Sequence, residues 1–94
     1  MTLKELKKLR KNDIIEVIWL DATADSRWLL EENIVKKPLE KCKTVGYFFD
    51  ADRTALKLSM SVATTDGQRD VMIIPTNCIV TIKIFGDNGW QLLQ

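Results

Sequence analysis

Hydrophobic and polar residues alternate in the second half of the chain in the way that favours β-strands. Over residues 55–63, one face of a strand would carry four apolar side chains, Leu56, Leu58, Met60 and Val62. Other runs are rich in β-branched and aromatic residues. They predict four further strands, over 14–20, 43–49, 71–74 and 79–85.

The segments between these strands contain strong turn signals. Asp66-Gly67 predicts a hairpin turn, since both residue types tolerate positive φ. Gly46 inside a strand indicates a bulge or a close approach of two backbones. Between Ile74-Pro75 and Ile79 there is room for one tight turn only. Consecutive strands joined this closely predict an antiparallel meander.

Other patterns are found before and between the strands. Residues 1–12 predict a short basic amphipathic helix, because Thr2 and Glu5 have capping-box spacing and an apolar residue recurs at every third position from Leu3 to Leu9. Residues 21–41 predict a long excursion with one irregular turn of helix or strand. Residues 86–94 are expected to form a C-terminal tail.

The predicted fold is mainly β, a small five-stranded antiparallel SH3-like barrel with a short N-terminal helix. Curling hides the sheet edges and lets five short strands share one core. The tight turn before Ile79 is of the kind that joins the last two strands of SH3-like barrels. We expect one domain, 1–94, with the barrel over 14–85, since its length is that of a single domain.

Short motifs resemble a group of small uncharacterised proteins of tailed bacteriophages. They are Val17-x-Trp19-x-Asp21, Trp28, Cys42-x-Thr44-Val45-Gly46-Tyr47, and Ile74-Pro75 with Ile79, within about residues 17–85. The resemblance implies a phage origin and no particular activity. The leading helix is similar to that of Sm-like ring proteins, although the glycine and Asp-x-x-x-Asn pattern expected of Sm proteins is missing.

Composition excludes several function classes. The chain has 14 Lys and Arg, 13 Asp and Glu, a net charge of +1 and no His, so the commonest general base and metal ligand are missing. Cys42 and Cys78 are too few for a zinc site and predict two reduced, mostly buried thiols, with a single structural disulfide as the alternative. We therefore expect no enzyme, no metal and no cofactor. No apolar run could span a membrane and no secretory signal is present, which predicts a cytoplasmic protein, in the host cytoplasm if phage-encoded.

Two binding hypotheses remain. The first is a protein-interaction module, acting on a partner or by homo-oligomerisation, whose contact residues would be Trp28, Tyr47, Trp90 and Asp21. The alternative is nucleic-acid or nucleotide binding through Trp28 and five basic residues of the leading helix, Lys4, Lys7, Lys8, Arg10 and Lys11. The simpler interpretations are that Trp28 covers an open end of the barrel and that the basic residues form a solvated face. A structural virion component is a third class.

Overall fold

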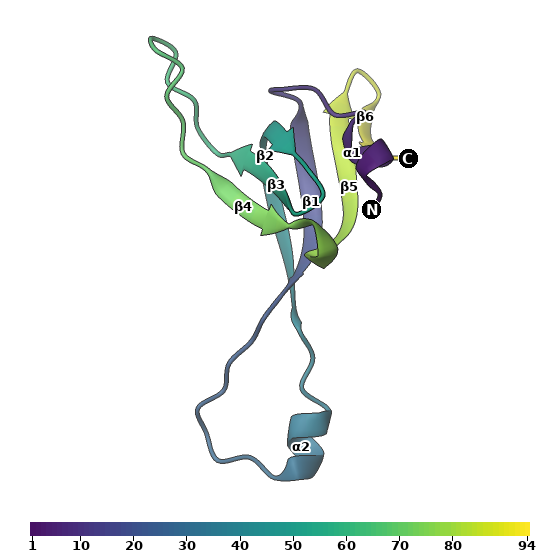
Figure 1. The fold of residues 1–94 in the computed structure, drawn as a ribbon, viewed down its shortest axis with the longest axis vertical. Helices are drawn as coiled ribbons and strands as arrows, with labels where there is room; N and C mark the ends of the chain where they lie inside the picture. Colours follow the sequence, from purple (N-terminus) through teal and green to yellow (C-terminus); the bar gives the residue numbers. More distant parts are fainter.

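The computed structural model describes all residues, 1–94, and its secondary structure is mainly β (Figure 1). The prediction of a β-rich fold is confirmed. In chain order the elements are α1 (Leu3–Leu6), β1 (Ile14–Asp21), α2 (Glu31–Val35), β2 (Glu40–Ala51), β3 (Ala55–Ser59), β4 (Met72–Pro75), the 3₁₀ turn η1 (Thr76–Cys78), β5 (Ile79–Gly86) and β6 (Gly89–Leu92).

The six strands form one open antiparallel sheet in the order β4-β3-β2-β1-β5-β6. The predictions of five strands and of a closed barrel are therefore wrong. To close a barrel, β4 would have to pair with the free edge of β5. In this structure β6 pairs with that edge, from Lys83 to Gly86. The sheet curls instead of closing, and β4 and β6 remain as its two edges.

The predicted tail contains the sixth strand. Gly86 pairs with Gly89, so β5 and β6 are joined by a two-residue loop, and Gly89 has a φ of 79° that favours glycine. The rings of Phe85 and Trp90 meet edge to face beside this loop, with centroids 5.2 Å apart. This aromatic pair and the loop register hold the last residues against β5.

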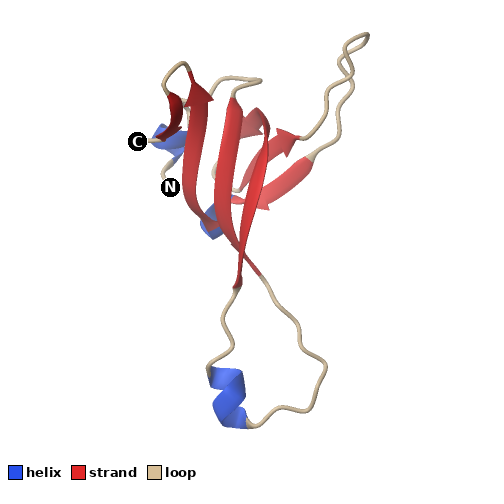
Figure 2. Cartoon of the chain, turned by 180° about the vertical axis from the view of Figure 1, so that it is seen from behind, coloured by secondary structure: helices blue, strands red, loops and turns tan.

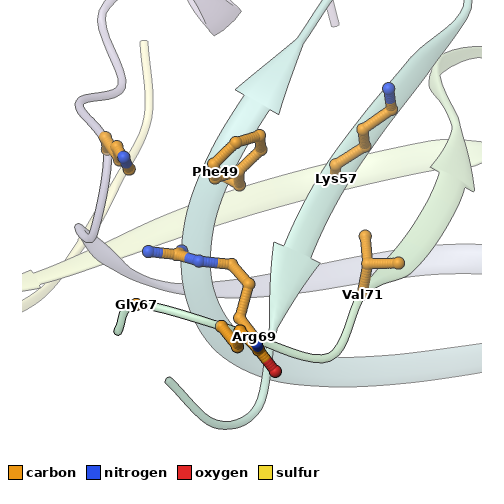
Figure 3. A pocket seen from close by; sticks show the side chains of 7 residues that line it. Phe49, Lys57, Gly67, Arg69 and Val71 are labelled. Atoms are coloured by element: carbon orange, nitrogen blue, oxygen red, sulfur yellow. The ribbon is translucent and has the colours of Figure 1, made fainter. Parts of the chain in front are cut away.

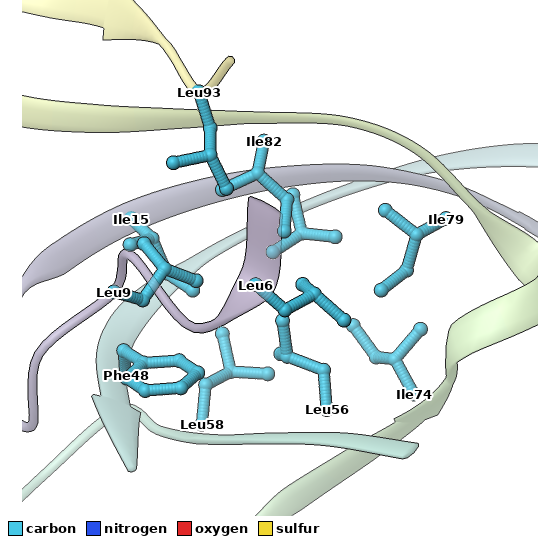
Figure 4. Close-up of a cluster of buried hydrophobic side chains, with 11 residues drawn as sticks. Leu6, Leu9, Ile15, Phe48, Leu56, Leu58, Ile74, Ile79, Ile82 and Leu93 are labelled. Atoms are coloured by element: carbon cyan, nitrogen blue, oxygen red, sulfur yellow. The ribbon is translucent and has the colours of Figure 1, made fainter. Parts of the chain in front are cut away.

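The core lies on the inner face of the curled sheet (Figure 4). Leu6 and Leu9 of the leading segment cover this face, and Leu93 closes it from the other terminus. The strands supply the remaining buried apolar residues, Ile15, Val17, Phe48, Leu56, Leu58, Ile74, Ile79 and Ile82. Trp19 packs against this core half-buried, and its Nε1 donates a hydrogen bond to Thr44 Oγ1 at 3.0 Å.

The N-terminal helix is shorter than predicted. The capping box of Thr2 and Glu5 is present, but α1 ends at Leu6 instead of residue 12. The amide of Lys7 still bonds four residues back, but those of Lys8 and Leu9 bond three residues back, as in a 3₁₀ turn. This tighter winding brings Leu6 and Leu9 to the same side of the segment, where both are buried.

Strand β3 is also shorter than predicted. It ends at Ser59, and the next two amides, of Met60 and Ser61, donate to the Asp70 carboxylate instead of to a neighbouring strand. Ser59 is therefore buried while Met60 is exposed, which reverses the predicted alternation at that point. Beyond it, residues 60–71 form a protruding hairpin whose tip contains Gly67, with a φ of 75°.

Two other predictions are confirmed. The link from β4 to β5 is the single 3₁₀ turn η1. Residues 22–39, within the predicted 21–41, leave the sheet as an excursion with one turn of helix, α2, and point away from the core (Figure 1). The radius of gyration is 16.0 Å, compared with about 12 Å for a compact chain of this length.

Gly46 marks a close approach of two backbones, as predicted. A Cβ at this position would lie 2.7 Å from the carbonyl oxygen of Ser59 in the adjacent strand β3. A side chain there would push β2 and β3 apart, because a backbone atom cannot move aside alone.

We predict that Gly46→Ala lowers the free energy of unfolding by about 1–3 kcal/mol, the usual cost of overpacking. Urea denaturation followed by circular dichroism measures the change. Gly86→Ala is the matched control, because a Cβ at Gly86 meets nothing within 4 Å. Equal losses in the two variants would contradict the close approach.

Candidate functional site

The predicted contact residue Trp28 lies in an arm, which we define as residues 22–39. Trp28 is fully exposed, and four more large apolar residues of the arm are exposed with it, Leu30, Ile34, Val35 and Leu39. Helix α2 buries none of its residues. The arm extends away from the sheet (Figure 2). Trp28 therefore does not cover an end of the sheet, and the apolar side chains of the arm have no cover from their own chain.

Asp25 organises the arm by joining its two limbs. Its Oδ2 lies 2.8 Å from both Arg27 Nη2 and Lys37 Nζ, and its Oδ1 accepts hydrogen bonds from the backbone and side chain of Arg27. Hydrogen bonds from Arg27, and then from Lys37, hold the pKa of Asp25 well below its usual range. The carboxylate therefore stays charged at neutral pH.

Tyr47 and Trp90, predicted from the sequence as separate candidates, lie in one row on the outer face of the sheet. Tyr47 pairs with Ile14, and Trp90 pairs with Phe85. Continuing the β1–β5 register by one residue places Ile14 opposite Phe85. We call these four residues, Tyr47, Ile14, Phe85 and Trp90, the outer row. Each is 38–50% exposed, and no helix lies in front of β1, β2 or β5 on this side (Figure 2).

The other predicted residues lie apart from the outer row. Asp21 is the last residue of β1, at the base of the arm, and its carboxylate accepts the amide hydrogen of Ala22. Lys4, Lys7, Lys8 and Arg10 are exposed in the leading segment, where Lys8 Nζ donates to the Gln94 carbonyl oxygen. None of these basic residues of the leading segment lies near Trp28, because the arm extends from the opposite end of the sheet (Figure 1).

Lys11 is the one predicted basic residue that reaches a concave surface. Its Nζ lies 5.4 Å from the centroid of the Phe49 ring, and Arg69 Cζ lies 5.0 Å from the same centroid. Both distances are within the range of cation–π attraction. Lys57, Val71, Gly67 and Gln68 complete the lining (Figure 3). We call this depression the Phe49 hollow.

Phe49, Lys57 and Arg69 were not singled out in the sequence. A signal was available in Phe48-Phe49, because strict alternation can bury only one of two adjacent aromatic residues. Phe48 is buried, and the β2–β3 register shifts between Phe48 and Asp50. Phe49 therefore remains on the outer face, 41% exposed.

Burial or hydrogen bonds within the fold account for the remaining potentially reactive side chains. Burial, and then the charges of Asp21 and Glu40, raise the pKa of Cys42, so its thiol is a poor nucleophile at neutral pH. Both cysteines are free and half-buried. Asp52 accepts hydrogen bonds from Thr54 and Ala55 within its turn, and these lower its pKa.

No three His, Cys, Asp or Glu residues gather as metal ligands would. Neither α1 nor α2 approaches the length and apolar character of a membrane-crossing helix.

Comparisons with protein-family models, with curated proteins and with solved structures find no match to this chain. The resemblance to bacteriophage and Sm-like proteins therefore stays a prediction. The arm, the outer row and the Phe49 hollow are the surfaces from which a function must be argued.

We predict that Asp25→Asn loosens the arm at neutral pH. The heteronuclear NOE of arm amides, measured by NMR, should fall, while β1 and β5 keep theirs. Because the pKa of Asp25 is lowered in the folded state, the ion pairs persist above its ordinary value of about 4. They are lost as the pH falls through the lowered pKa.

Glu32→Gln is the control for Asp25→Asn, because it removes one carboxylate from the same arm at a position without an ion pair. An arm that is equally ordered in both variants would show that Asp25 does not join its limbs.

Proposed function

We propose that this protein is a non-catalytic binding module that self-associates head to tail, with the arm of one copy covering the outer row of the next. The observation that carries the proposal is that one chain leaves two separate apolar surfaces uncovered.

The arm needs a partner to be stable as an ordered element. Helix α2 has five residues and no buried side chain, whereas isolated helices shorter than about 12–15 residues are marginal in water. Full burial of a large apolar side chain is worth about 1.5–3 kcal/mol. Covering Trp28, Ile34 and Val35 would thus offset the entropy cost of ordering the arm.

The outer row offers a surface of matching chemistry. Its four side chains come from four adjacent strands and form a continuous apolar strip, with a T-shaped aromatic pair at one end. Aromatic residues are enriched in the buried centres of protein interfaces. The flanking pair on the next register position, Glu16 and Lys83, supplies a polar border to the strip.

The accessible surface supports a second copy as the occupant. The chain exposes 7110 Å², while a folded monomer of its size exposes about 5,500 Å². The excess of about 1,600 Å² equals the area buried in a standard protein–protein interface. In a head-to-tail chain each copy buries its arm on one neighbour and its outer row under another. There is then one interface per copy, and its area equals the excess surface of one copy.

The proposed contact is heterologous, because the arm of one copy meets the outer row of the next and is not returned by it. The ladder between β1 and β2 runs to the pair Asp21–Glu40, so the arm starts in line with these strands and extends away from the body. The arm of one chain is thus presented to a neighbour and not to its own outer row. Such contacts generate rings when the rotation closes and filaments when it does not.

We predict that the protein forms oligomers whose mass, measured by size-exclusion chromatography with light scattering, increases with concentration. The arm variant Trp28→Ser/Ile34→Ser and the row variant Phe85→Ser should each be monomeric and keep the wild-type circular dichroism spectrum. Val71→Ser is the control, because it removes an exposed apolar side chain outside both surfaces and should leave the oligomers intact.

Mixing the two variants tests the polarity of the contact. The arm variant retains an outer row and the row variant retains an arm, so an equimolar mixture should form a one-to-one dimer that grows no further. A wild-type monomer at all concentrations, or two variants that stay monomeric when mixed, would contradict the proposal. If the arm binds a different protein instead of a second copy, the wild-type protein would be a monomer at all concentrations.

A further inference from the structure

The Phe49 hollow brings together three cations. Lys11, Lys57 and Arg69 line it, and no acidic residue does. The two ion pairs of the molecule are both in the arm, on Asp25. Asp50 pairs with Lys57 across the β2–β3 ladder. However, Asp50 is not part of the lining, and the two side chains form no ion pair.

The other carboxylates near the hollow are held by backbone amides. Asp52 interacts with Lys57 by charge, but its Oδ1 accepts hydrogen bonds from the amides of Thr54 and Ala55. Asp70 accepts hydrogen bonds from the amides of Met60 and Ser61, and Asp66 accepts one from Gln68. Their charge is therefore directed into the turns of the 60–71 hairpin. Three like charges left this close together repel one another, and an anion placed between them would relieve the repulsion.

The cations are held in position by parts of the chain that are distant in sequence. Arg69 Nη2 donates a hydrogen bond to Asn12 Oδ1 at 3.1 Å, while its guanidinium lies against the Phe49 ring. Lys11 comes to the same ring from the leading segment, and Lys57 stands on β3 (Figure 3). Four separate segments thus converge on this place, so the cluster follows from the fold and not from a run of basic residues.

The shape and chemistry of the hollow indicate the class of ligand. Its volume of about 480 Å³ lies within the range of small-molecule sites. Guanidinium and ammonium groups bind phosphate oxygens well, and the apolar walls formed by Phe49 and Val71 suit a sugar or base. We propose that the Phe49 hollow binds a phosphate ester, either as a nucleotide or as a phosphate of a single-stranded nucleic acid. This site shares no residue with the arm or the outer row, so it stands independently of self-association.

Fluorescence anisotropy with a labelled single-stranded oligonucleotide tests the proposal. One phosphate held by the three cations predicts a slope of log affinity against log salt of about −0.7, hence a loss of about 3-fold between 50 and 200 mM salt. Lys57→Gln and Lys11→Gln should each lower the affinity at 50 mM salt by about tenfold, because each removes one hydrogen bond to a charged group. Lys43→Gln is the matched control, since Lys43 is an exposed cation on the outer face of β2, six residues from Phe49.

Competition identifies the source of the phosphate. Displacement of the labelled strand by a nucleoside triphosphate at millimolar concentration supports the site with a nucleotide as ligand. Displacement by an unlabelled oligonucleotide alone supports it with a strand as ligand.

Absence of binding at 50 mM salt, or equal loss of affinity in Lys57→Gln and Lys43→Gln, would overturn the proposal. Lys4→Gln separates the hollow from a diffuse basic segment, because Lys4 belongs to the leading segment but not to the lining. It should leave the affinity unchanged.

Discussion

Burial of one face of a single curled sheet is the constraint on which the rest of this structure depends. Only 14 of 94 residues are buried, and eleven of these form the apolar core. A chain this short cannot provide a second layer for both faces of a six-stranded sheet. The leading segment, with Leu6 and Leu9, covers the inner face, and the outer face is left without a covering element.

The strands were predictable because alternation and β-branched runs are local signals. Gly46 and η1 were predictable for the same reason, since a lone glycine in a strand and a proline before a short link each have a local physical cause. Closure into a barrel was not predictable, because it depends on which strand pairs with the free edge of β5. Trp90 and Leu92 alternate too briefly to show that β6 would occupy it.

The candidate site was predictable only in its parts. Tyr47, Trp90 and Trp28 were identified as candidate contact residues, but their grouping depends on register. The pairs Tyr47–Ile14 and Phe85–Trp90 bring the outer row together, while the long excursion carries Trp28 away from it. The Phe49 hollow depends on a register shift in β2 and on a hairpin fold that places Arg69 beside Lys11.

The uncovered outer row and the uncovered arm are thus consequences of the same shortage of covering elements, and head-to-tail association resolves both. Paramagnetic relaxation enhancement in a mixed sample tests this most directly. One copy carries a spin label at Asn33→Cys in α2, with Cys42 and Cys78 replaced by serine, and the other copy is isotope-labelled and unmodified. The account predicts line broadening at the amides of Ile14, Tyr47, Phe85 and Trp90 of the isotope-labelled copy. Unbroadened signals there, or broadening confined to the arm of the other copy, would contradict it.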